Sequence, residues 1–506
     1  MNWTPFYYSY CKRYHYKGGK EAMITFLFSI VLLIVGYFTY GKYIVKMFGV
    51  KEDRATPAYT SADGVDYVPM STSKNSLIQL LNIAGVGPIF GPIMGALYGP
   101  VAFIWIVVGA IFAGAVHDYL TGMISIRNRG AHLPELAGKF LGKFMKHIVN
   151  AFALLLLVLV GTVFVSAPAG LLYNLMNGWM AMGIIVALIF LYYILATLLP
   201  IDKIIGRFYP IFGALLVISA VGIGGMMVIK GVPIPELTFA NLHPDNIPIF
   251  PLLFLTISCG ALSGFHATQS PIISRTTKKE SEGRKIFYGM MIAEAIIAMI
   301  WAAAGMALFN GITLSELLAA GGPAVIVSEV STVMLGAVGG TLAILGVIIL
   351  PITSGDTAFR SARMIIADYI KYPQAKILSR LWIALPMFAI SIALTRIDFN
   401  ILWRYFSWAN QSTAVIALFV GAMYLFIAGK NYWVALIPGT FMLMATMTYI
   451  LNAAIGFGLP MNVALIGATV ISIFLVALFF NAAVKARAAQ IPLEEDITGW
   501  EITRTV

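Results

Sequence analysis

Charged residues are scarce in this chain. Asp, Glu, Lys and Arg make up 11% of its 506 residues, hydrophobic residues make up 60%, and the mean hydropathy is +0.88. Soluble domains carry about 25% charged residues. Apolar runs of about 20 residues, which is the length that spans a bilayer as a helix, fill most of the sequence. We therefore predict an all-α integral membrane protein that has the lipid bilayer as a partner.

Cysteine is rare in the chain, and the common sequence motifs for nucleotide binding and hydrolysis are absent. Cys11 and Cys259 are the two cysteines, so their spacing defines no disulfide framework. The sequence has no G-x-x-x-x-G-K-[ST], H-E-x-x-H or G-x-S-x-G motif. The first motif marks the P-loop that binds ATP in many pumps, and the other two mark metalloproteases and serine hydrolases. We expect a non-enzyme that uses no cofactor.

Positive charge is concentrated in alternate connections between the apolar runs. Connections 126–147, 273–285 and 356–380 are basic, whereas 231–246, 311–331 and 453–461 contain neither Lys nor Arg. Cytoplasmic loops carry the excess of Lys and Arg. The net charge of +11 is therefore interpreted as a topology signal and not as a nucleic-acid-binding signal. It predicts a multi-pass protein of the bacterial cytoplasmic (inner) membrane with a cytoplasmic C-terminus.

The order of the apolar runs predicts about thirteen transmembrane helices in several units. These are an N-terminal tail (1–22), an extra helix (23–47), a first set of five helices (77–230), a second set of five (247–427), two additional helices (432–484) and a cytoplasmic tail (485–506). With thirteen helices the basic tail lies outside, against the charge rule. Our hypothesis is that translation starts at Met23 and that the tail is not native. The alternative is twelve spans, with 23–47 placed differently.

Residues 132–146 are too short to span a membrane. Leu133, Leu136, Phe140 and Phe144 recur at helical spacing, and three lysines lie on the other side. This pattern predicts an amphipathic helix on the cytoplasmic surface. A solvated linker is the alternative.

Two apolar stretches contain helix-breaking residues. LNIAGVGPIFGPIMGALYGP (81–100) holds five glycines and three prolines, and TISCGALSGFHATQSP (256–271) holds two glycines, one proline and several polar residues. Helix packing through small residues or proline kinks would explain part of the first stretch. They explain less well the run 84–88, where Gly85, Gly87 and Pro88 share one turn. Within lipid a broken helix is tolerated where its backbone is buried in protein or lines a water-filled cavity.

The two breaks open the two sets of five helices. An odd number of spans in each set inverts the second set relative to the first. Discontinuous helices in corresponding positions of two inverted halves indicate the midplane site of a transporter. The sequence thus favours a transporter with a site where the two breaks meet.

Four motifs in this chain resemble those of a known family. GVGPIFGP (85–92), AGAVHDY (113–119), SCGALSGFHATQSP (258–271) and ITSGDTAFRSARMIIADY (352–369) are similar to signatures of the CstA carbon-starvation family, and the resemblance covers about residues 23–480. It implies a LeuT-like 5+5 inverted repeat and uptake of peptides or pyruvate during carbon starvation. Larger relatives carry a His pair where this chain has Ile78 and Gln79, and this chain is shorter.

The breaks supply the candidate substrate-binding residues. The first turn of a helix has free N–H groups and the positive end of the helix dipole, which attract anions. We expect a substrate carboxylate, as in pyruvate or a peptide, to bind at Gly85, Val86, Gly87, Ser258, Gly260, Ser263, Gly264, His266 and Gln269.

His266 and Glu294 are candidate proton-relay residues. An imidazole titrates near neutral pH, and an ionisable residue within a membrane helix is a candidate functional group. Packing or a hydrogen bond to a neighbouring helix is the alternative for each. His117 and Asp118 show no cluster of metal ligands around them in the sequence, so no metal is expected beyond a sodium ion.

Two further pairs of residues are candidates, one for binding the coupled cation and one for a gate. By resemblance to LeuT-like transporters, Thr353 and Ser354 would complete a cation site with carbonyls from about Leu81 and Ala84, in which oxygen ligands suit a hard ion. Back-bonding of the hydroxyls to their own helix is the alternative. Asp356 and Arg360 are four apart, and we expect either an inner gate or a plain helix-end ion pair.

Together these features predict a secondary active transporter. We expect cation-coupled symport of pyruvate or short peptides, with sodium or a proton as the coupling ion. The alternatives are a channel, or a carrier for another small carboxylate or an amino acid. The sequence leaves the oligomeric state open.

Overall fold

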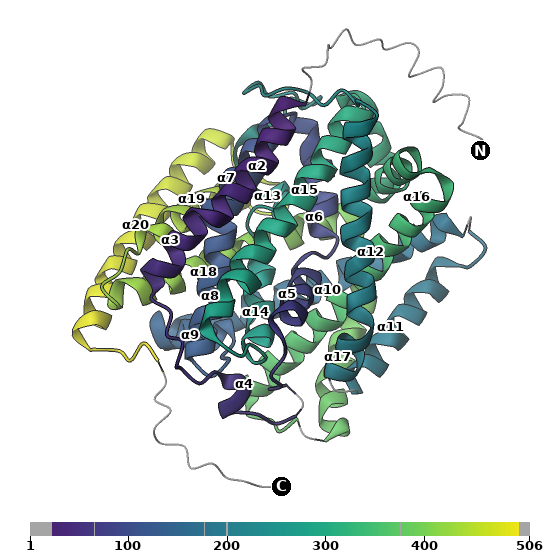
Figure 1. Cartoon of the computed structure of the whole chain (residues 1–506). Coiled ribbons are helices and arrows are strands. Elements are labelled where there is room, and N and C mark those ends of the chain that lie inside the picture. The colour runs from purple at the N-terminus through teal and green to yellow at the C-terminus, as the bar shows by residue number, and fades with distance from the viewer. Residues whose placement is uncertain (1–22, 65, 177, 199–200, 375, 495–506) are drawn as a thin grey trace.

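Helices make up most of the residues that the structure describes. The computed structural model describes residues 23–64, 66–176, 178–198, 201–374 and 376–494 (Figure 1). Within these residues the single β pairing is an isolated bridge between Met70 and Thr277. The predicted all-α class is confirmed. The predicted tail 1–22 and most of the tail 485–506 lie outside the described residues.

The first half of the chain begins with two short consecutive helices and a loop. Its helices are α2 (Ile24–Phe38), α3 (Tyr40–Phe48), α4 (Pro57–Thr60), α5 (Thr72–Ile83), α6 (Gly87–Gly95), α7 (Val101–Gly109), α8 (Ala115–Arg127), α9 (Leu133–Phe140), α10 (Lys143–Leu175), α11 (Met182–Leu198) and α12 (Ile201–Ile229). A 3-10 turn, η1 (Ala96–Tyr98), extends α6, and a π-helical turn, η2 (Ala110–Gly114), joins α7 to α8.

The second half repeats the pattern of a broken helix followed by long helices. Its helices are α13 (Ile249–Thr256), α14 (Gly264–Ser274), α15 (Gly289–Leu308), α16 (Gly311–Ile370), α17 (Ile377–Leu394), α18 (Phe399–Ile427), α19 (Trp433–Asn452) and α20 (Met461–Ala488). Two short turns, η3 (Glu280–Glu282) and η4 (Arg284–Tyr288), precede α15. The division into inverted sets 77–230 and 247–427 stays a prediction.

Both predicted breaks are present. The first lies between α5 and α6, where residues 84–86 are not helical and the segments Thr72–Ile83 and Gly87–Tyr98 are bent by 48°. Pro88 occupies the first turn of α6, where a missing N–H costs no hydrogen bond. The second break separates α13 from α14, and Gly260 within it has φ +90°, a left-handed conformation that favours glycine.

Helix α16 departs from the predicted boundaries. Gly322 and Gly336 have φ values of +68° and +72°, so they divide α16 into three helical pieces. The last piece continues to Ile370, inside the predicted basic connection 356–380. The charged residues at the start of that connection do not end the helix. Asp356, Arg360 and Arg363 are instead buried within the protein, at 1%, 3% and 3% exposure.

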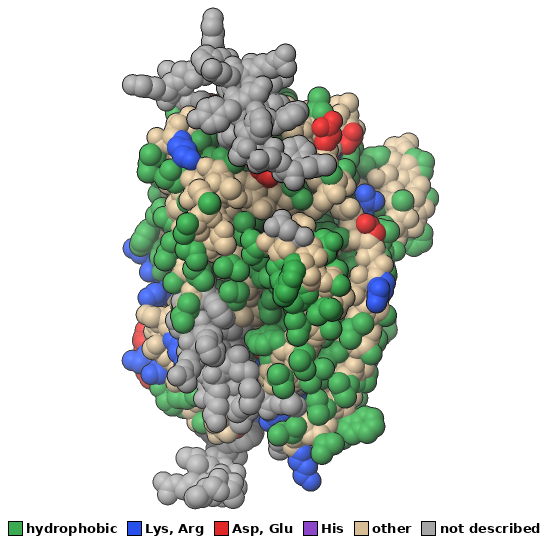
Figure 2. Space-filling model, turned by 90° about the vertical axis from the view of Figure 1, so that its right-hand side faces the viewer, with side chains coloured by type: hydrophobic (Ala, Val, Ile, Leu, Met, Phe, Trp, Pro, Cys, Tyr) green, Lys and Arg blue, Asp and Glu red, His purple; other side chains and the backbone are tan. Residues whose placement is uncertain are grey.

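The outer surface of the bundle is apolar. Among the described residues nine helices are long and apolar enough to cross a membrane, and the bent pair formed by α5 and α6 would be a tenth. Hydrophobic side chains cover the middle of the face in Figure 2, and charged side chains lie mainly towards its margins. The chain is therefore a multi-pass membrane protein. The predicted count of about thirteen helices stays a prediction, since α11 and the described part of α12 are shorter apolar helices.

The segment 132–146 forms two elements and not one surface helix. Helix α9 ends at Phe140, Gly142 has φ +101°, and a new helix begins at Lys143. Leu133 and Leu136 of α9 are buried against the protein, whereas Phe144 is 75% exposed. The prediction of one continuous interfacial helix was wrong because the left-handed glycine ends it.

His132 lies directly before α9, outside the spanning segments. It is buried, and neither ring nitrogen has a hydrogen-bond partner. Burial, reinforced by the nearby Arg275 guanidinium, keeps the pKa of His132 well below its usual range.

Candidate functional site

The two helix breaks pack directly against each other. A Cβ atom added to Gly87 in the first break would overlap the thiol of Cys259 in the second. A Cβ added to Gly91 of α6 would lie 2.7 Å from the Thr256 carbonyl oxygen. Because these two glycines have no side chain, the backbone of α6 can lie directly against the second break. A site between paired breaks requires this close approach.

Side chains from neighbouring helices satisfy the backbone that the second break leaves free. The Trp105 indole donates to the Ile257 carbonyl at 3.0 Å, and the Gln411 amide donates to the Leu262 carbonyl at 2.8 Å. The Asn410 side-chain oxygen accepts from the Phe265 N–H at 2.7 Å and from the Ser263 hydroxyl at 3.1 Å. The break is thus buried in protein, which is one of the two conditions for breaking a helix in lipid.

Asn410 also contacts the predicted anion site at the second break. It caps the first turn of α14 by accepting from the Phe265 N–H, between the predicted residues Gly264 and His266, and the predicted anion site itself stays a prediction. Sequence reasoning did not identify Asn410. The signal available was the polar run Asn410-Gln411-Ser412-Thr413 inside an otherwise apolar helix.

A chain of ionisable groups runs across the second break. His266 of α14 lies between Asp118 of α8 and Glu294 of α15, with its Nδ1 at 2.9 Å from Asp118 Oδ2 and its Nε2 at 3.4 Å from Glu294 Oε2. Nδ1 of His117 lies 2.8 Å from the other Asp118 oxygen. All four side chains are at most 1% exposed. Each carboxylate thus faces an imidazole, which provides the partner that a buried ionised group needs.

His117 and Asp118 belong to the same buried cluster as His266, which the sequence did not indicate. His117 lies as deeply buried as His266, and Asp118 contacts His266 directly. Sequence reasoning missed them because the residues that surround them come from α14, more than 140 positions away. The prediction that His266 and Glu294 relay protons is not tested by this contact and stays a prediction.

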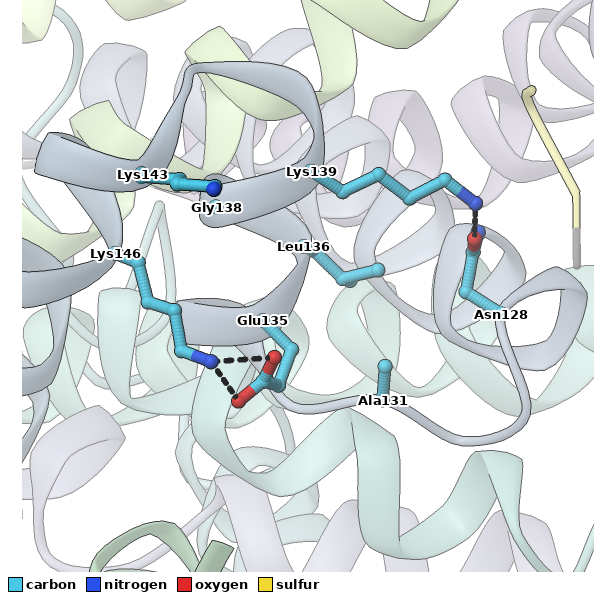
Figure 3. A pocket seen from close by; sticks show the side chains of 8 residues that line it. All are labelled: Asn128, Ala131, Glu135, Leu136, Gly138, Lys139, Lys143 and Lys146. Atoms are coloured by element: carbon cyan, nitrogen blue, oxygen red, sulfur yellow. Dashed lines mark hydrogen bonds and ion pairs between the residues drawn. The ribbon is translucent and has the colours of Figure 1, made fainter. Parts of the chain in front are cut away.

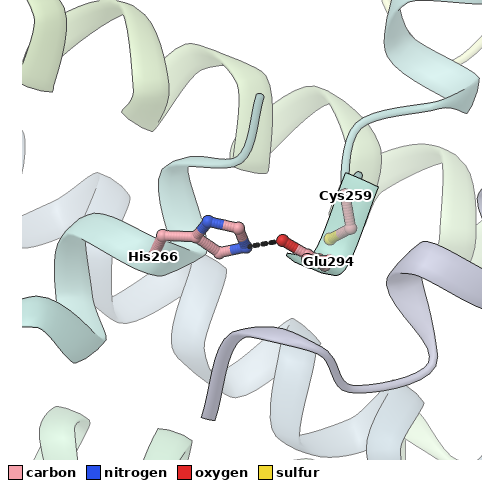
Figure 4. Close-up of side chains that lie close together, drawn as sticks. All are labelled: Cys259, His266 and Glu294. Carbon is pink, nitrogen blue, oxygen red and sulfur yellow. Dashed lines mark ion pairs between the residues drawn. The ribbon is translucent and has the colours of Figure 1, made fainter. Parts of the chain in front are cut away.

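Cys259 completes a group of three metal-ligating side chains. Its Sγ, one ring nitrogen of His266 and a carboxylate oxygen of Glu294 all lie within 4.8 Å of one another. Figure 4 shows the imidazole of His266 directed at Glu294, with Cys259 beside the carboxylate. Thiol, imidazole and carboxylate are the ligand types that bind zinc-like ions. The sequence predicted no metal site here.

Several buried polar groups near the breaks have no partner. Both amide atoms of Gln79 and of Asn82 on α5 lack hydrogen bonds, as do the Ser258 hydroxyl and the Gln269 side-chain oxygen. Buried polar atoms are normally hydrogen-bonded, so such groups are candidates for contacts with a ligand. Gln79 and Asn82 were not predicted as binding residues, although their types within an apolar helix are visible in the sequence.

The predicted substrate residues all lie at or beside the two breaks. Gly85, Val86 and Gly87 form the first break, and Ser258, Gly260, Ser263 and Gly264 belong to the second. His266 and Gln269 follow on α14. The nitrogen of the Gln269 amide donates to Thr268 Oγ1 at 3.0 Å and to Ser361 Oγ at 3.4 Å, so Gln269 faces α16 rather than α15.

The predicted cation-site residues are also brought together. The Ser354 hydroxyl of α16 donates to the Leu81 carbonyl at 2.7 Å, across 273 positions of sequence. Thr353 donates to the Leu350 carbonyl of its own helix at 2.7 Å. Ala84 follows the last residue of α5, at the start of the first break. Ser354 also donates to the Leu350 carbonyl at 3.1 Å, so both hydroxyls bond back to their own helix, and the cation site stays a prediction.

Asp356 and Arg360 form the expected pair, with 3.8 Å between Oδ2 and Nη2. Arg360 also donates to the Ala196 carbonyl at 3.1 Å. The pair therefore joins α16 to α11 inside the protein, and its role as an inner gate stays a prediction.

A surface cavity of about 350 Å³ lies away from the breaks, around α9 and the start of α10. Figure 3 shows two of its three lysines in contact with neighbours, Lys146 with Glu135 and Lys139 with Asn128. The cavity is on the surface, next to the basic connection 126–147, and shares no lining residue with the breaks.

Sequence comparisons identify relatives over much of the chain. The family model described as Carbon starvation protein CstA matches residues 21–241, 180–315 and 307–449. An uncharacterized membrane protein of Haemophilus influenzae is 49% identical over 352 residues, which cover 59% of this chain and 95% of that protein. The peptide transporter CstA of Escherichia coli is 26% identical, and the match covers 83% of this chain and 79% of the relative. The peptide transporter CstA of Campylobacter jejuni is 28% identical, and the match covers 56% of this chain but half of the relative's length.

Solved structures share the fold. The manganese transporter of Eremococcus coleocola, in complex with an aromatic bis-isothiourea substituted compound, matches with a TM-score of 0.51 and 13% identity, covering 85% of this chain and 98% of that one. MhsT in complex with L-phenylalanine matches with a TM-score of 0.51 and 14% identity, covering 82% and 99%. Both have the LeuT-like fold, so the predicted fold class is confirmed.

Proposed function

The chain belongs to the carbon starvation protein CstA family, and we propose that it is a secondary active transporter that couples uptake of short peptides or pyruvate to the entry of a cation. The observation that carries this proposal is the meeting of two broken helices around a fully buried polar centre. Paired breaks of this kind hold substrates and ions in transporters that alternate access around a fixed site.

Short peptides are the first candidate substrates. Relatives from several bacteria are named peptide transporters. A peptide group offers one hydrogen-bond donor and one acceptor, and a side-chain amide can pair with both. The unpartnered amides of Gln79 and Asn82 suit that chemistry. Pyruvate shares the carboxylate that the N–H groups of the first break, at Gly85–Gly87, would bind.

The contact between Ser354 and Leu81 is the candidate coupling site. A carbonyl released by the first break and a hydroxyl from α16 provide oxygen ligands of the kind that a hard cation requires. Sodium and a proton both remain candidates for the coupled ion. We further propose that the side with the basic connections faces the cytoplasm of a bacterium and that the C-terminus lies on that side.

Uptake into proteoliposomes that contain the full chain tests the proposal. Labelled dipeptides and labelled pyruvate are supplied separately, each with a sodium gradient, a proton gradient or neither. We expect one substrate class to accumulate when one gradient is present, to saturate, and to show counterflow. Flux that never exceeds equilibrium and does not saturate would indicate a channel instead.

A pair of variants tests the coupling site. Thr353→Ala combined with Ser354→Val should abolish gradient-driven accumulation and can spare exchange. Thr341→Val is the matched control, because Thr341 lies on the same helix and bonds back to its own backbone. Wild-type accumulation by the double variant would show that these hydroxyls only brace α16.

A further inference from the structure

Cys259, His266 and Glu294 direct polar atoms at one another inside the protein. Ordinary hydrogen bonds do not explain why these atoms meet. Nε2 of His266 and both carboxylate oxygens of Glu294 make no hydrogen bond of ordinary geometry, although the two groups lie within ion-pair distance. The 3.4 Å between Nε2 and Oε2 exceeds the 2.7–3.2 Å of an ordinary N–H···O bond. All three residues are at most 1% exposed, so water does not satisfy these atoms from the surface. Unpartnered buried polar atoms of this kind are costly.

The directions of the side chains suit a shared cation. Asp118 bonds Nδ1 of His266, which leaves the opposite nitrogen, Nε2, as the atom that faces Glu294. A carboxylate on the far nitrogen of a ligating histidine is the usual second layer of a zinc site, where it fixes the ring and raises its basicity. The cluster therefore has the outer layer of a metal site as well as three inner ligand types.

We propose that Cys259, His266 and Glu294 bind one divalent metal ion of the zinc class. Sulfur, nitrogen and oxygen ligands together favour an ion of borderline softness over magnesium or calcium. Three protein ligands leave one tetrahedral position open. The Cys259 thiol gives up its proton on coordination. The thiolate and the Glu294 carboxylate then balance the two positive charges of the ion.

Gly87 makes room for this site. Any side chain at position 87 would overlap the Cys259 thiol, so the first break leaves the space that the sulfur occupies. A bound ion would tie Cys259, inside the second break, to α14 and α15. It would thus hold the second break in one conformation, which stabilises the protein and opposes movement of α14 relative to α15.

Cobalt is the probe, because a cobalt–thiolate bond gives a charge-transfer band in the near ultraviolet. The full chain is produced in cells supplied with cobalt or with zinc, purified in detergent, and measured by absorbance and by elemental analysis. We expect one equivalent of metal per chain, a thiolate band with cobalt, and a higher unfolding temperature for metal-loaded protein than for chelator-treated protein.

Variants assign the ligands. Cys259→Ser should remove the thiolate band, whereas Cys11→Ser, the matched control at the other cysteine, should keep it. Asp118→Asn should weaken metal binding about 10- to 100-fold, as loss of an outer partner does. Glu294→Gln should lower the metal content, and each variant is accepted only if it elutes as a single folded species.

Three results would overturn the proposal. These are a folded wild-type protein without stoichiometric metal, a thiolate band that survives Cys259→Ser, or a band that disappears with Cys11→Ser. Metal content and absorbance are measured without transport. Failure of this inference is therefore distinguishable from failure of the proposed uptake function.

Discussion

Asn410→Ala should destabilise the second helix break. The change removes the oxygen that accepts from the Phe265 N–H at 2.7 Å and from the Ser263 hydroxyl at 3.1 Å. A buried N–H without a partner costs about 1–3 kcal/mol, and loss of a neutral hydrogen bond costs about 1 kcal/mol more. The expected loss is therefore about 2–4 kcal/mol in the free energy of unfolding.

Thermal unfolding of the purified protein in detergent, followed by tryptophan fluorescence, measures this effect. Ser263→Ala removes only the hydroxyl bond and should lower the unfolding temperature less than Asn410→Ala. Asn410→Asp keeps an accepting oxygen at the N-terminus of α14 but places an unpaired carboxylate at a fully buried position, so it should also lower the unfolding temperature. Its lost nitrogen has only a distant contact of 4.0 Å with Cys259 Sγ.

Transport separates positioning from simple stability. Because Asn410 holds the first turn of α14, its loss should displace His266 and lower uptake even at temperatures where the variant stays folded. An Asn410→Ala variant that unfolds at the wild-type temperature and transports normally would refute the reasoning. The capping bond would then contribute nothing to the break.

Three further outcomes are expected. Gly87→Val should abolish uptake while membrane insertion persists, because its side chain overlaps the Cys259 thiol; normal uptake would show that the breaks separate easily. Asp118→Asn keeps the shape of the side chain but loses the carboxylate beside His266, so the free energy of unfolding should fall by about 1.5–3 kcal/mol. An unchanged unfolding temperature would contradict the pairing of Asp118 with His266. His132 has a lowered pKa, so only the unfolded chain takes up its proton as pH falls below about 6.5. The free energy of unfolding should then decrease by up to about 1.4 kcal/mol for each pH unit. His132→Gln should remove this pH dependence between pH 7.5 and 5.5, whereas His147→Gln, at an exposed histidine, is the control and should keep it.

Composition and local pattern were enough to predict the class of protein and the positions of the two breaks. Low charge and long apolar runs require a bilayer around the chain, and this holds for any arrangement of the helices. Glycine and proline crowd residues 84–88, where a continuous helix would be weak whatever it packed against. The contact between Ser354 and Leu81 was also expected, but only through resemblance to a known fold.

Tertiary structure alone decided which side chains meet at the second break. Asp118, His266, Glu294 and Asn410 lie on four different helices, and no local pattern reports a distance between them. The same reason applies to the charged residues of α16, which the sequence placed in a connection. Charged residues end a membrane helix only when they reach water, and Asp356 instead finds Arg360 inside the protein. Local sequence records where the backbone breaks and how apolar each helix is, whereas the partners of buried polar groups depend on how the helices pack.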